Sequence, residues 1–462
     1  MDYDDVLSGI FDRVQFVWDQ GLFKEARLAY EQLLELLEKE DEYGYSLNRP
    51  DDFDEDMARY LRAIILTEKP GNRAKALLES MRRLQQEHGY YSTINLTAIQ
   101  QVAQDELPDQ SAFLNEWIDH LHGHLDDLSD MLLREAIGLR DGTAGLEKLA
   151  KQEGKLRPRA YVDWVAEFEK AKDFSAILNA GKTALMNLGD TPLRSEVADI
   201  MFRAAAAVKD AKQMKECRWE AFCAAPDLGR LMDLWEVQRT TKDKIAAMDK
   251  ARKFVDHGKK KTDDDSTPAC LNGESPCSPD RDVWVHSALL SGDWKSVWAR
   301  AEKLNALGWS SSSHEQGMAV LAAMVWIHGK SIQLPPQLES LWRRQLRSGS
   351  YRFRSLDEDR SEVLESAYRT VIEANTWRKR DMTVRLNQCE GIVRQRVSVI
   401  VSNTHRGAYE RAALLTVACA ETFKCHGKST DGDGLILEMR KAFPRHSSFQ
   451  REMKNALAMK KG

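Results

Sequence analysis

Apolar residues recur at helical spacing along nearly every long segment of this 462-residue chain, whereas runs of alternating β-branched residues are almost absent. Spacings of three and four residues place side chains on one face of a helix, and strict alternation places them on one face of a strand. The pattern therefore predicts an all-α fold. Apolar residues make up 42% of the chain, which is too many for disorder throughout. We expect most of the 12 tryptophans to pack between helices.

Residues 18–36 predict a helical hairpin. A first helix ends at Gly21, and a second begins at Phe23, with Ala26 and Tyr30 on one side. Glycine suits a tight turn because it adopts a positive φ without steric cost. The small alanine lets the two helices approach closely. This order of glycine, aromatic, alanine and aromatic residues resembles the second half of a tetratricopeptide repeat.

Weaker copies of the hairpin follow at three later turns. In each copy a turn is followed by a bulky or small residue that should anchor the next helix, and then by the helix itself. The three turns are Lys172-Asp173-Phe174, Asp210-Ala211 and Gly292-Asp293-Trp294. Only the step from the first to the second of these is close to the length of a helix-pair repeat. The sequence therefore predicts a degenerate, tetratricopeptide-like (TPR-like) solenoid of helical hairpins.

Charge is distributed unevenly along the chain, although its net charge is only −5. Acidic residues outnumber basic ones over residues 1–60, and basic residues outnumber acidic ones over residues 341–462. This polarity favours head-to-tail contacts, a charged partner, or simply solvated faces of opposite sign. No apolar run is long enough to span a membrane, and the acidic start lacks the basic segment of a signal peptide. We therefore expect a cytoplasmic protein without membrane contact.

The sequence divides into three parts. Residues 1–256 form an acidic N-terminal helical-repeat block, and residues 283–462 form a basic C-terminal one. Between them, residues 257–282 carry lysine and aspartate runs and a stretch rich in proline, glycine and serine. This composition predicts a flexible loop or linker. A surface insertion is the favoured interpretation of the loop over 257–281, and a contact or proteolytic cleavage site is the alternative.

Glu116, His120 and His124 are candidate metal ligands. Residues four apart share one ridge of a helix, which lets two imidazoles bind one metal ion. Leu121 and Leu125 belong to the apolar stripe that should be buried beside this ridge. A ridge that flanks the core and holds no metal is the favoured interpretation.

Other motifs that would indicate catalysis or a cofactor are absent from the sequence. The seven cysteines form neither CxxC nor CxC, and no Gly-Lys pair lies in the register of a phosphate-binding Walker loop. Residues 431–434 (DGDG) begin like a calcium loop, but Leu435 and Ala442 occupy later ligand positions, so we expect a solvated turn. The sequence thus predicts a protein that is not an enzyme and that holds no cofactor or metal.

Arginines and aromatic residues alternate in the basic C-terminal block, where Trp342, Tyr351 and Phe353 lie among the first arginines. Such surfaces follow phosphates and stack on bases. Acidic residues 357–359 interrupt the run, so charge pairing between helices is favoured over nucleic-acid binding. The candidate partner-binding residues are Arg343, Arg344, Arg347, Arg352, Arg354, Arg378, Lys379, Arg380, Arg394 and Arg396.

Two passages of the chain are typical of helical hairpins. In residues 217–228 an aromatic pair precedes the proline that ends a helix, and residues 406–413 continue into residues 443–450. Both resemble the helical regions of bacterial proteins that carry a SWIM-type zinc finger. That finger needs Cys-x-Cys and Cys-x-His, and neither occurs in this chain. The resemblance therefore implies the helical solenoid without the zinc finger.

The sequence as a whole predicts a non-enzymatic scaffold, adaptor or inhibitor that binds other proteins through a groove or a charged face. We expect one or more protein partners, with a protease or a component of a regulatory complex among the candidates, in a bacterial cytoplasm. The alternative is a nucleic-acid-associated factor that uses the arginine-rich C-terminal block.

Overall fold

The described part of the chain is entirely helical, with turns and short connections between the helices. The computed structural model describes residues 3–37, 52–87, 94–258, 281–309, 314–329, 333–350, 361–375 and 377–459. Within these ranges the all-α prediction is confirmed. The described residues form two compact units, of which the first ends at Gly189 and the second begins at Asp190.

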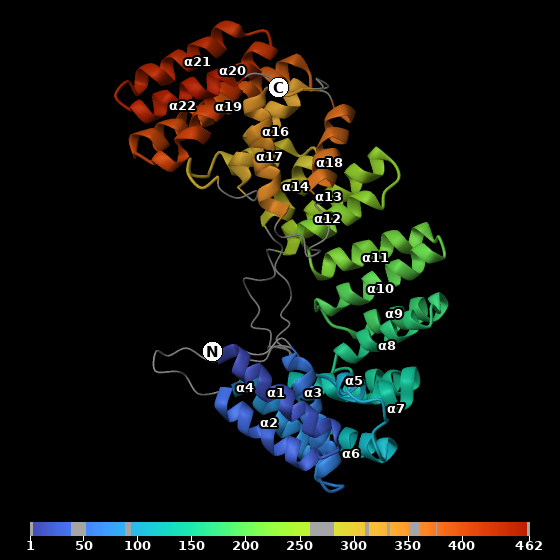
Figure 1. Cartoon of the computed structure of the whole chain (residues 1–462). Helices are drawn as coiled ribbons and strands as arrows, with labels where there is room; N and C mark the ends of the chain where they lie inside the picture. The colour runs from blue at the N-terminus through green and yellow to red at the C-terminus, as the bar shows by residue number, and fades with distance from the viewer. Residues whose placement is uncertain are drawn as a thin grey trace. The chain divides into compact units, whose positions relative to one another are not determined.

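The first unit packs helices that mostly follow one another in the chain, such as α1 with α2, α6 with α7 and α8 with α9. Its helices are α1 (Tyr3–Asp19), α2 (Phe23–Leu37), α3 (Phe53–Thr67), α4 (Arg73–Glu87), α5 (Leu96–Gln101), α6 (Gln110–His122), α7 (Asp127–Glu153), α8 (Arg159–Lys170) and α9 (Phe174–Asn187) (Figure 1). The long helix α7 is interrupted at Gly142, where φ is 60°. The predicted first hairpin is present, because α1 packs on α2 and both Ala26 and Tyr30 are fully buried.

The second unit begins with similar hairpins, in which α10 packs on α11 and α13 packs on α14. Its helices are α10 (Leu193–Ala207), α11 (Ala211–Ala224), α12 (Leu228–Glu236), α13 (Thr241–Gly258), α14 (Arg281–Ser291), α15 (Trp294–Ala301), α16 (Glu315–His328), α17 (Pro336–Ser350), α18 (Ser361–Ala374), α19 (Lys379–Ser402), the short 3₁₀ helix η1 (Arg406–Ala408), α20 (Tyr409–Cys425), α21 (Ser429–Ala442) and α22 (Ser447–Ala458) (Figure 1). Residues 257–258 end α13 and residues 281–282 begin α14. The rest of the predicted linker over 257–282 lies outside the described residues.

Helix α20 is the centre of the C-terminal part of the second unit. It contacts α16, α17, α19, α21 and α22, and Figure 1 shows it between α19 and α21. A helix that is apolar on all sides must be buried on all sides, and α20 carries small or apolar residues such as Ala413, Leu415 and Cys419 around its circumference. The C-terminal part of the second unit is therefore a bundle of helices around α20. It differs from the rest of the described chain, where helices mostly pack on their neighbours in sequence.

The same backbone turn recurs between successive helices. In each copy one residue has a left-handed φ, and these residues are Gly21, Lys172, Lys209, Gly292, Thr404 and Gly427. The amide of that residue donates to the carbonyl three residues earlier, and the next amide donates to the carbonyl five residues before it, as Gly292 does to Leu289 and Asp293 to Ala288. This pair of hydrogen bonds is the Schellman motif, which satisfies the last carbonyls of a helix.

An aspartate follows the left-handed residue in three of these turns and begins the next helix. The side chains of Asp173, Asp210 and Asp293 each accept a hydrogen bond from an amide in the first turn of α9, α11 and α15. Such an N-cap satisfies amides that have no partner within the helix. One short segment therefore ends one helix and starts the next, which explains the weaker hairpin copies that the sequence contains.

The predicted solvated turn at residues 431–434 is wrong, because these residues form the first turns of α21. Gly432 is buried in the contact between α20 and α21. A Cβ atom at this position would lie 2.6 Å from the carbonyl oxygen of Ala420. The glycine is therefore explained by the close approach of two helices, and a turn conformation is not needed.

Candidate anion-binding site

Three arginines line one recess in the second unit, where helices α16, α17, α19 and α20 meet. The recess has a volume of about 460 Å³, including space that is open to solvent. We call it the arginine recess; its lining residues are Trp309, Leu321, Leu341, Arg344, Gln345, Arg396, Arg411 and Leu415. Arginine residues thus line the recess together with a tryptophan and three leucines.

Arg396 is held in place by its neighbours. Only 6% of its surface is exposed, although it lies on the polar-rich helix α19. Its Nη1 donates a hydrogen bond of 2.5 Å to the carbonyl oxygen of Ala306. Its guanidinium carbon lies 4.3 Å from the centroid of the Trp309 ring, which is the distance of a cation–π contact. Two contacts therefore hold one guanidinium group at the wall of the recess.

The ring of Trp309 is itself held in place by residues at the start of α16. Its Nε1 donates to Oε1 of the buried Gln316 at 3.0 Å, and Nε2 of Gln316 donates to the carbonyl oxygen of Ala301 at 3.0 Å. The ring also lies against Gly317, where an added Cβ atom would approach within 3.2 Å of it. The first turn of α16 therefore holds the indole that supports Arg396.

The positive charge of the recess has no acidic counterpart among the described residues. Neither aspartate nor glutamate lines the recess, and within the described ranges Arg344, Arg396 and Arg411 form no ion pair. Burial, and then the nearby charge of Arg411, lower the pKa of Arg396 to about 10. Burial and Arg396 likewise lower the pKa of His314, so this imidazole is neutral near neutral pH. Of the three arginines, Arg396 thus carries its charge in a largely buried place, Arg411 is half-buried and Arg344 is exposed.

The predicted partner-binding arginines lie in several different environments. Arg344 and Arg396 are brought together in the recess. Arg343 is paired with Glu339, and Arg394 is paired with Glu390 and Glu438. The remaining described candidates are exposed on α17 or at the start of α19; they are Arg347, Arg378, Lys379 and Arg380. Arg352 and Arg354 lie outside the described residues.

The expected interleaving of arginine with aromatic residues is only partly accessible. Trp342 is 3% exposed and packs edge-on against Tyr368, with ring centroids 4.9 Å apart. It is therefore a core residue and offers no face for a base. Tyr351 and Phe353 lie outside the described residues.

Among the charged and aromatic residues of the recess, Arg411 and Trp309 are not in the list of candidates predicted from the sequence. Arg411 lies in the first turns of α20, within the passage over 406–413 that resembles a helical hairpin. Trp309 precedes α16 and has no motif around it. Their sequence positions are far from Arg344, so no local pattern could have grouped these residues.

The candidate metal ligands in the first unit are engaged in other contacts. Glu116 accepts hydrogen bonds from the Arg73 side chain at 3.3 Å and from the Ala74 amide at 3.2 Å, and these contacts together with the Gly71 amide lower its pKa. The rings of His120 and His124 are 5.0 Å apart. However, α6 ends at His122, so His124 does not continue the helical ridge. Within the described ranges, no three His, Cys, Asp or Glu side chains are grouped so that they could hold a metal ion.

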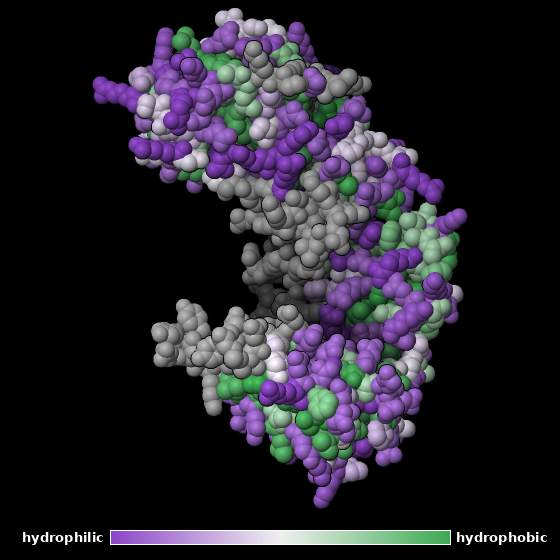
Figure 2. Space-filling model, in the orientation of Figure 1, coloured by the Kyte–Doolittle hydropathy of each residue, from purple (hydrophilic) through white to green (hydrophobic). Residues whose placement is uncertain are grey.

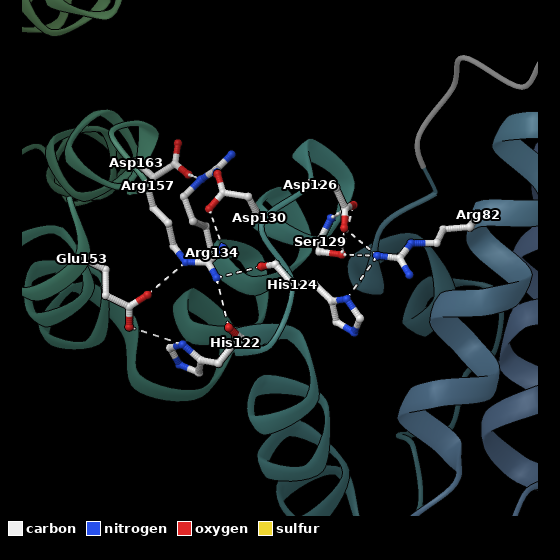
Figure 3. Close-up of polar contacts among 10 residues, drawn as sticks. All are labelled: Arg82, His122, His124, Asp126, Ser129, Asp130, Arg134, Glu153, Arg157 and Asp163. Atoms are coloured by element: carbon white, nitrogen blue, oxygen red, sulfur yellow. Dashed lines mark hydrogen bonds and ion pairs between the residues drawn. The ribbon is translucent and has the colours of Figure 1, made fainter. Parts of the chain in front are cut away.

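His124 instead belongs to a polar network that joins α6, α7 and α8 (Figure 3). The guanidinium group of Arg157 is almost completely buried and donates to the carbonyl oxygen of His124 and to the carboxylate of Asp130. Arg134 also binds Asp130. Leu125, which was expected in the buried stripe, is 45% exposed because the chain leaves the helix before it. The polar residues near His124 therefore form buried ion pairs, such as those of Asp130 with Arg134 and Arg157.

No protein family model matches the chain, and no curated protein matches it significantly. The resemblances to tetratricopeptide and SWIM-associated helical regions therefore gain no support from these comparisons. None of the described helices combines the length and the apolar character that a membrane crossing requires.

Proposed function

We propose that this chain is a non-enzymatic interaction protein, acting as a scaffold, adaptor or inhibitor, which binds a partner protein at the arginine recess. The observation that carries the proposal is that three arginines line one recess in which no aspartate or glutamate of the described residues takes part. A buried charge without a counter-charge, as Arg396 is among the described residues, is costly, and an anionic group of a partner would offset that cost.

The visible surface of the second unit favours a polar partner. The face of the second unit that Figure 2 shows is mostly hydrophilic, and apolar side chains are scattered over it. The exposed large apolar residues in its last helices, such as Val384 on α19, Leu437 on α21 and Leu457 on α22, come from different elements. We therefore propose that charge selects the partner, with Leu341 and Leu415 adding apolar contact at the recess itself.

A protein partner is favoured over a nucleic acid by how the other arginines are used. A nucleic-acid surface needs a row of free cations that follows successive phosphates. Arg343 and Arg394 are instead paired with glutamates of the chain itself, and the exposed candidates are divided between α17 and the start of α19. A recess that holds one anion fits one anionic side chain of a protein better than the successive phosphates of a nucleic acid.

The finer description of the fold belongs to the same proposal. We propose a degenerate TPR-like solenoid that ends in a bundle around α20, supported by the recurring Schellman turns and by the packing of successive helices. We also propose that the protein works in a cytoplasm. Its described cysteines form no disulfide, and burial raises the pKa of the Cys217 thiol to about 11, as expected for an unreactive core thiol.

The test is affinity capture from extracts of the source organism with the full chain as bait. The variant Arg344→Ala/Arg411→Ala removes two guanidinium groups, and Arg343→Ala is the matched control because Arg343 is paired outside the recess. We expect one protein in stoichiometric amount with the wild type and the control, and its loss with the double variant. Equal recovery with the double variant, or release of the partner by nuclease, would contradict the proposal.

A further inference from the structure

The geometry points to the arginine recess as a phosphate site, and we propose that it binds a phosphorylated side chain of the partner, so that partner binding depends on phosphorylation. This inference rests on the proposed function of the recess and adds the chemistry of the group that is bound. The class of ligand is a phosphate monoester dianion.

Charge balance is the first argument for a dianion. The recess brings together Arg344, Arg396 and Arg411, and no acidic side chain of the described residues shares it. A carboxylate brings one negative charge, whereas a phosphate monoester brings between one and a half and two near neutral pH. The dianion therefore neutralises more of the three charges when it enters this partly desolvated space.

The number of donors is the second argument. A guanidinium group has five N–H donors in a planar arrangement. Arg396 uses Nη1 for the Ala306 carbonyl, while Arg344 and Arg411 have no partner of this kind among the described residues. A carboxylate has two oxygen acceptors, but a phosphate monoester has three terminal oxygens and can accept from more than one arginine at once. Clusters of arginines are a common means of recognising phosphorylated side chains.

Preorganisation is the third argument. Arg396 is held by Ala306 and by the ring of Trp309, and Trp309 is held by Gln316. A site whose cation is already in place loses little conformational entropy when the anion binds. Arg344 is exposed and Arg411 is half-buried, so these two side chains are free to close on the ligand from the side that faces solvent.

The leucines in the recess indicate that the bound phosphate is an ester of an amino-acid side chain. Leu321, Leu341 and Leu415 line the same recess, so an anion that enters it has apolar side chains beside it. A phosphoserine or phosphothreonine would place the carbon atoms of its side chain against these leucines. Free phosphate offers no such contact and should bind more weakly.

The binding test uses calorimetric titration of the full chain with four probes: inorganic phosphate, phosphoserine blocked at both ends, the equally blocked glutamate, and phenyl phosphate. We expect saturable binding of both phosphate monoesters, with at least about tenfold weaker binding of glutamate. Inorganic phosphate should bind, but less tightly than the esters. Binding of inorganic phosphate with exclusion of both esters would overturn the inference, as would equal affinity for glutamate and phosphoserine, or no saturable binding at millimolar concentration.

Three variants locate the site. Arg344→Gln and Arg411→Gln keep the side chains polar and break no bond within the described structure, so both should fold. Each should weaken phosphoserine binding about tenfold or more. Arg343→Gln, which lies next to Arg344 but is paired with Glu339, should bind like the wild type. Unchanged affinity in both test variants would place phosphate binding elsewhere and overturn the inference.

The pH dependence of binding separates a dianion from a carboxylate. The second pKa of a phosphate monoester is about 6, so affinity for phosphoserine should fall when the pH is lowered from about 7.5 to about 5. Glutamate remains ionised over that interval. An affinity for phosphoserine that does not change over this interval would contradict recognition of the dianion.

The outcomes also distinguish this inference from the proposed function. If the partner protein is lost from the double variant but phosphoserine does not bind, the recess binds a partner through another anion, and only the present inference fails. If phosphoserine binds at the recess but capture of the partner is unaffected by the double variant, the phosphate site is real and the proposed function fails. If both the phosphate site and the proposed function are correct, treatment of the extract with phosphatase should abolish capture of the partner protein.

Discussion

In the core of the second unit, Nδ1 of His286 lies 2.8 Å from the hydroxyl oxygen of Tyr368. Both side chains are buried, and Nε2 of His286 has no hydrogen-bond partner among the described residues. Burial lowers the pKa of His286 to about 4, although the charge of Asp282 acts in the opposite direction. The imidazole is therefore neutral in the folded protein, and protonation must be accompanied by loss of this packing.

This relationship predicts acid instability. In the unfolded chain His286 titrates near 6.5 and takes up a proton first as the pH falls, so the stabilisation is complete above about 6.5 and is lost between about 6.5 and about 4. The full effect is on the order of 3 kcal/mol. Urea unfolding of the wild type and His286→Gln at pH 7.5, 5.5 and 4.5 measures it. The variant should show a smaller decrease with pH, whereas His405→Gln, at an exposed position, should decrease like the wild type. Parallel curves for His286→Gln and the wild type would contradict the prediction.

The contact of Gly432 with Ala420 predicts intolerance of even one methyl group. Gly432→Ala should lower the free energy of unfolding by about 1–3 kcal/mol, because the added Cβ atom overlaps the backbone of α20. Gly434→Ala is the matched control on the same helix, since nothing lies within 4 Å of its Cβ position. That control should be neutral or slightly stabilising, because alanine is the better helix former. Chemical unfolding of both variants measures the difference, and equal stabilities would contradict the prediction.

The left-handed turn at Lys209 predicts a stabilising substitution. Lys209 has a φ of 59° and is exposed. A side chain with a Cβ atom is disfavoured in this conformation, whereas glycine adopts it freely. Lys209→Gly should therefore raise the free energy of unfolding by about 0.5–1 kcal/mol, after the larger entropy of the unfolded glycine chain is subtracted. Lys215→Gly, inside α11, should lower it by about 1 kcal/mol. Thermal unfolding of the two variants should thus show shifts of opposite sign, and a lowered midpoint for Lys209→Gly would refute the turn argument.

The buried charge network in Figure 3 predicts a large loss when one partner is removed. Asp130 accepts from Arg134 and, at 2.9 Å, from Arg157. Asp130→Ala leaves the nearly inaccessible Arg157 without this carboxylate, and we expect a loss of about 3–5 kcal/mol. The control is Lys75→Ala, which removes an ion pair whose side chains are 70% and 65% exposed and should change stability little. A loss below about 1 kcal/mol for Asp130→Ala, measured by chemical unfolding, would show that the network does not stabilise the unit.

Features that depend on nearby residues could be predicted from the sequence. Helical spacing predicted the all-α fold, and the glycine, aromatic, alanine and aromatic order predicted the first hairpin. Ala26 and Tyr30 are indeed buried there. The end of α6 before His124 was not predicted, because the apolar spacing continues through Leu125 although the chain has left the helix.

Features that depend on distant residues could not be predicted. The recess combines Trp309 with Arg344 and Arg411, whose shared position results from the packing of α16, α17 and α20. The candidate list contained Arg344 and Arg396 because they lie in a basic block, but it also contained Arg394, whose charge is paired with Glu390 and Glu438. Composition identifies where cations are abundant, whereas the fold shows which of them are paired with an acidic residue of the described ranges.

The Schellman turns have a consequence for how this chain can change in length. Each turn satisfies its backbone hydrogen bonds within a few residues, as Lys209 and Asp210 do with Ala206 and Ala205. Joining or removing a whole helical hairpin at such a turn would leave no backbone group of the junction without its partner. Insertions and deletions of complete hairpins should therefore be tolerated better than those of single residues within a helix, so that relatives of this protein would differ in size by whole hairpins.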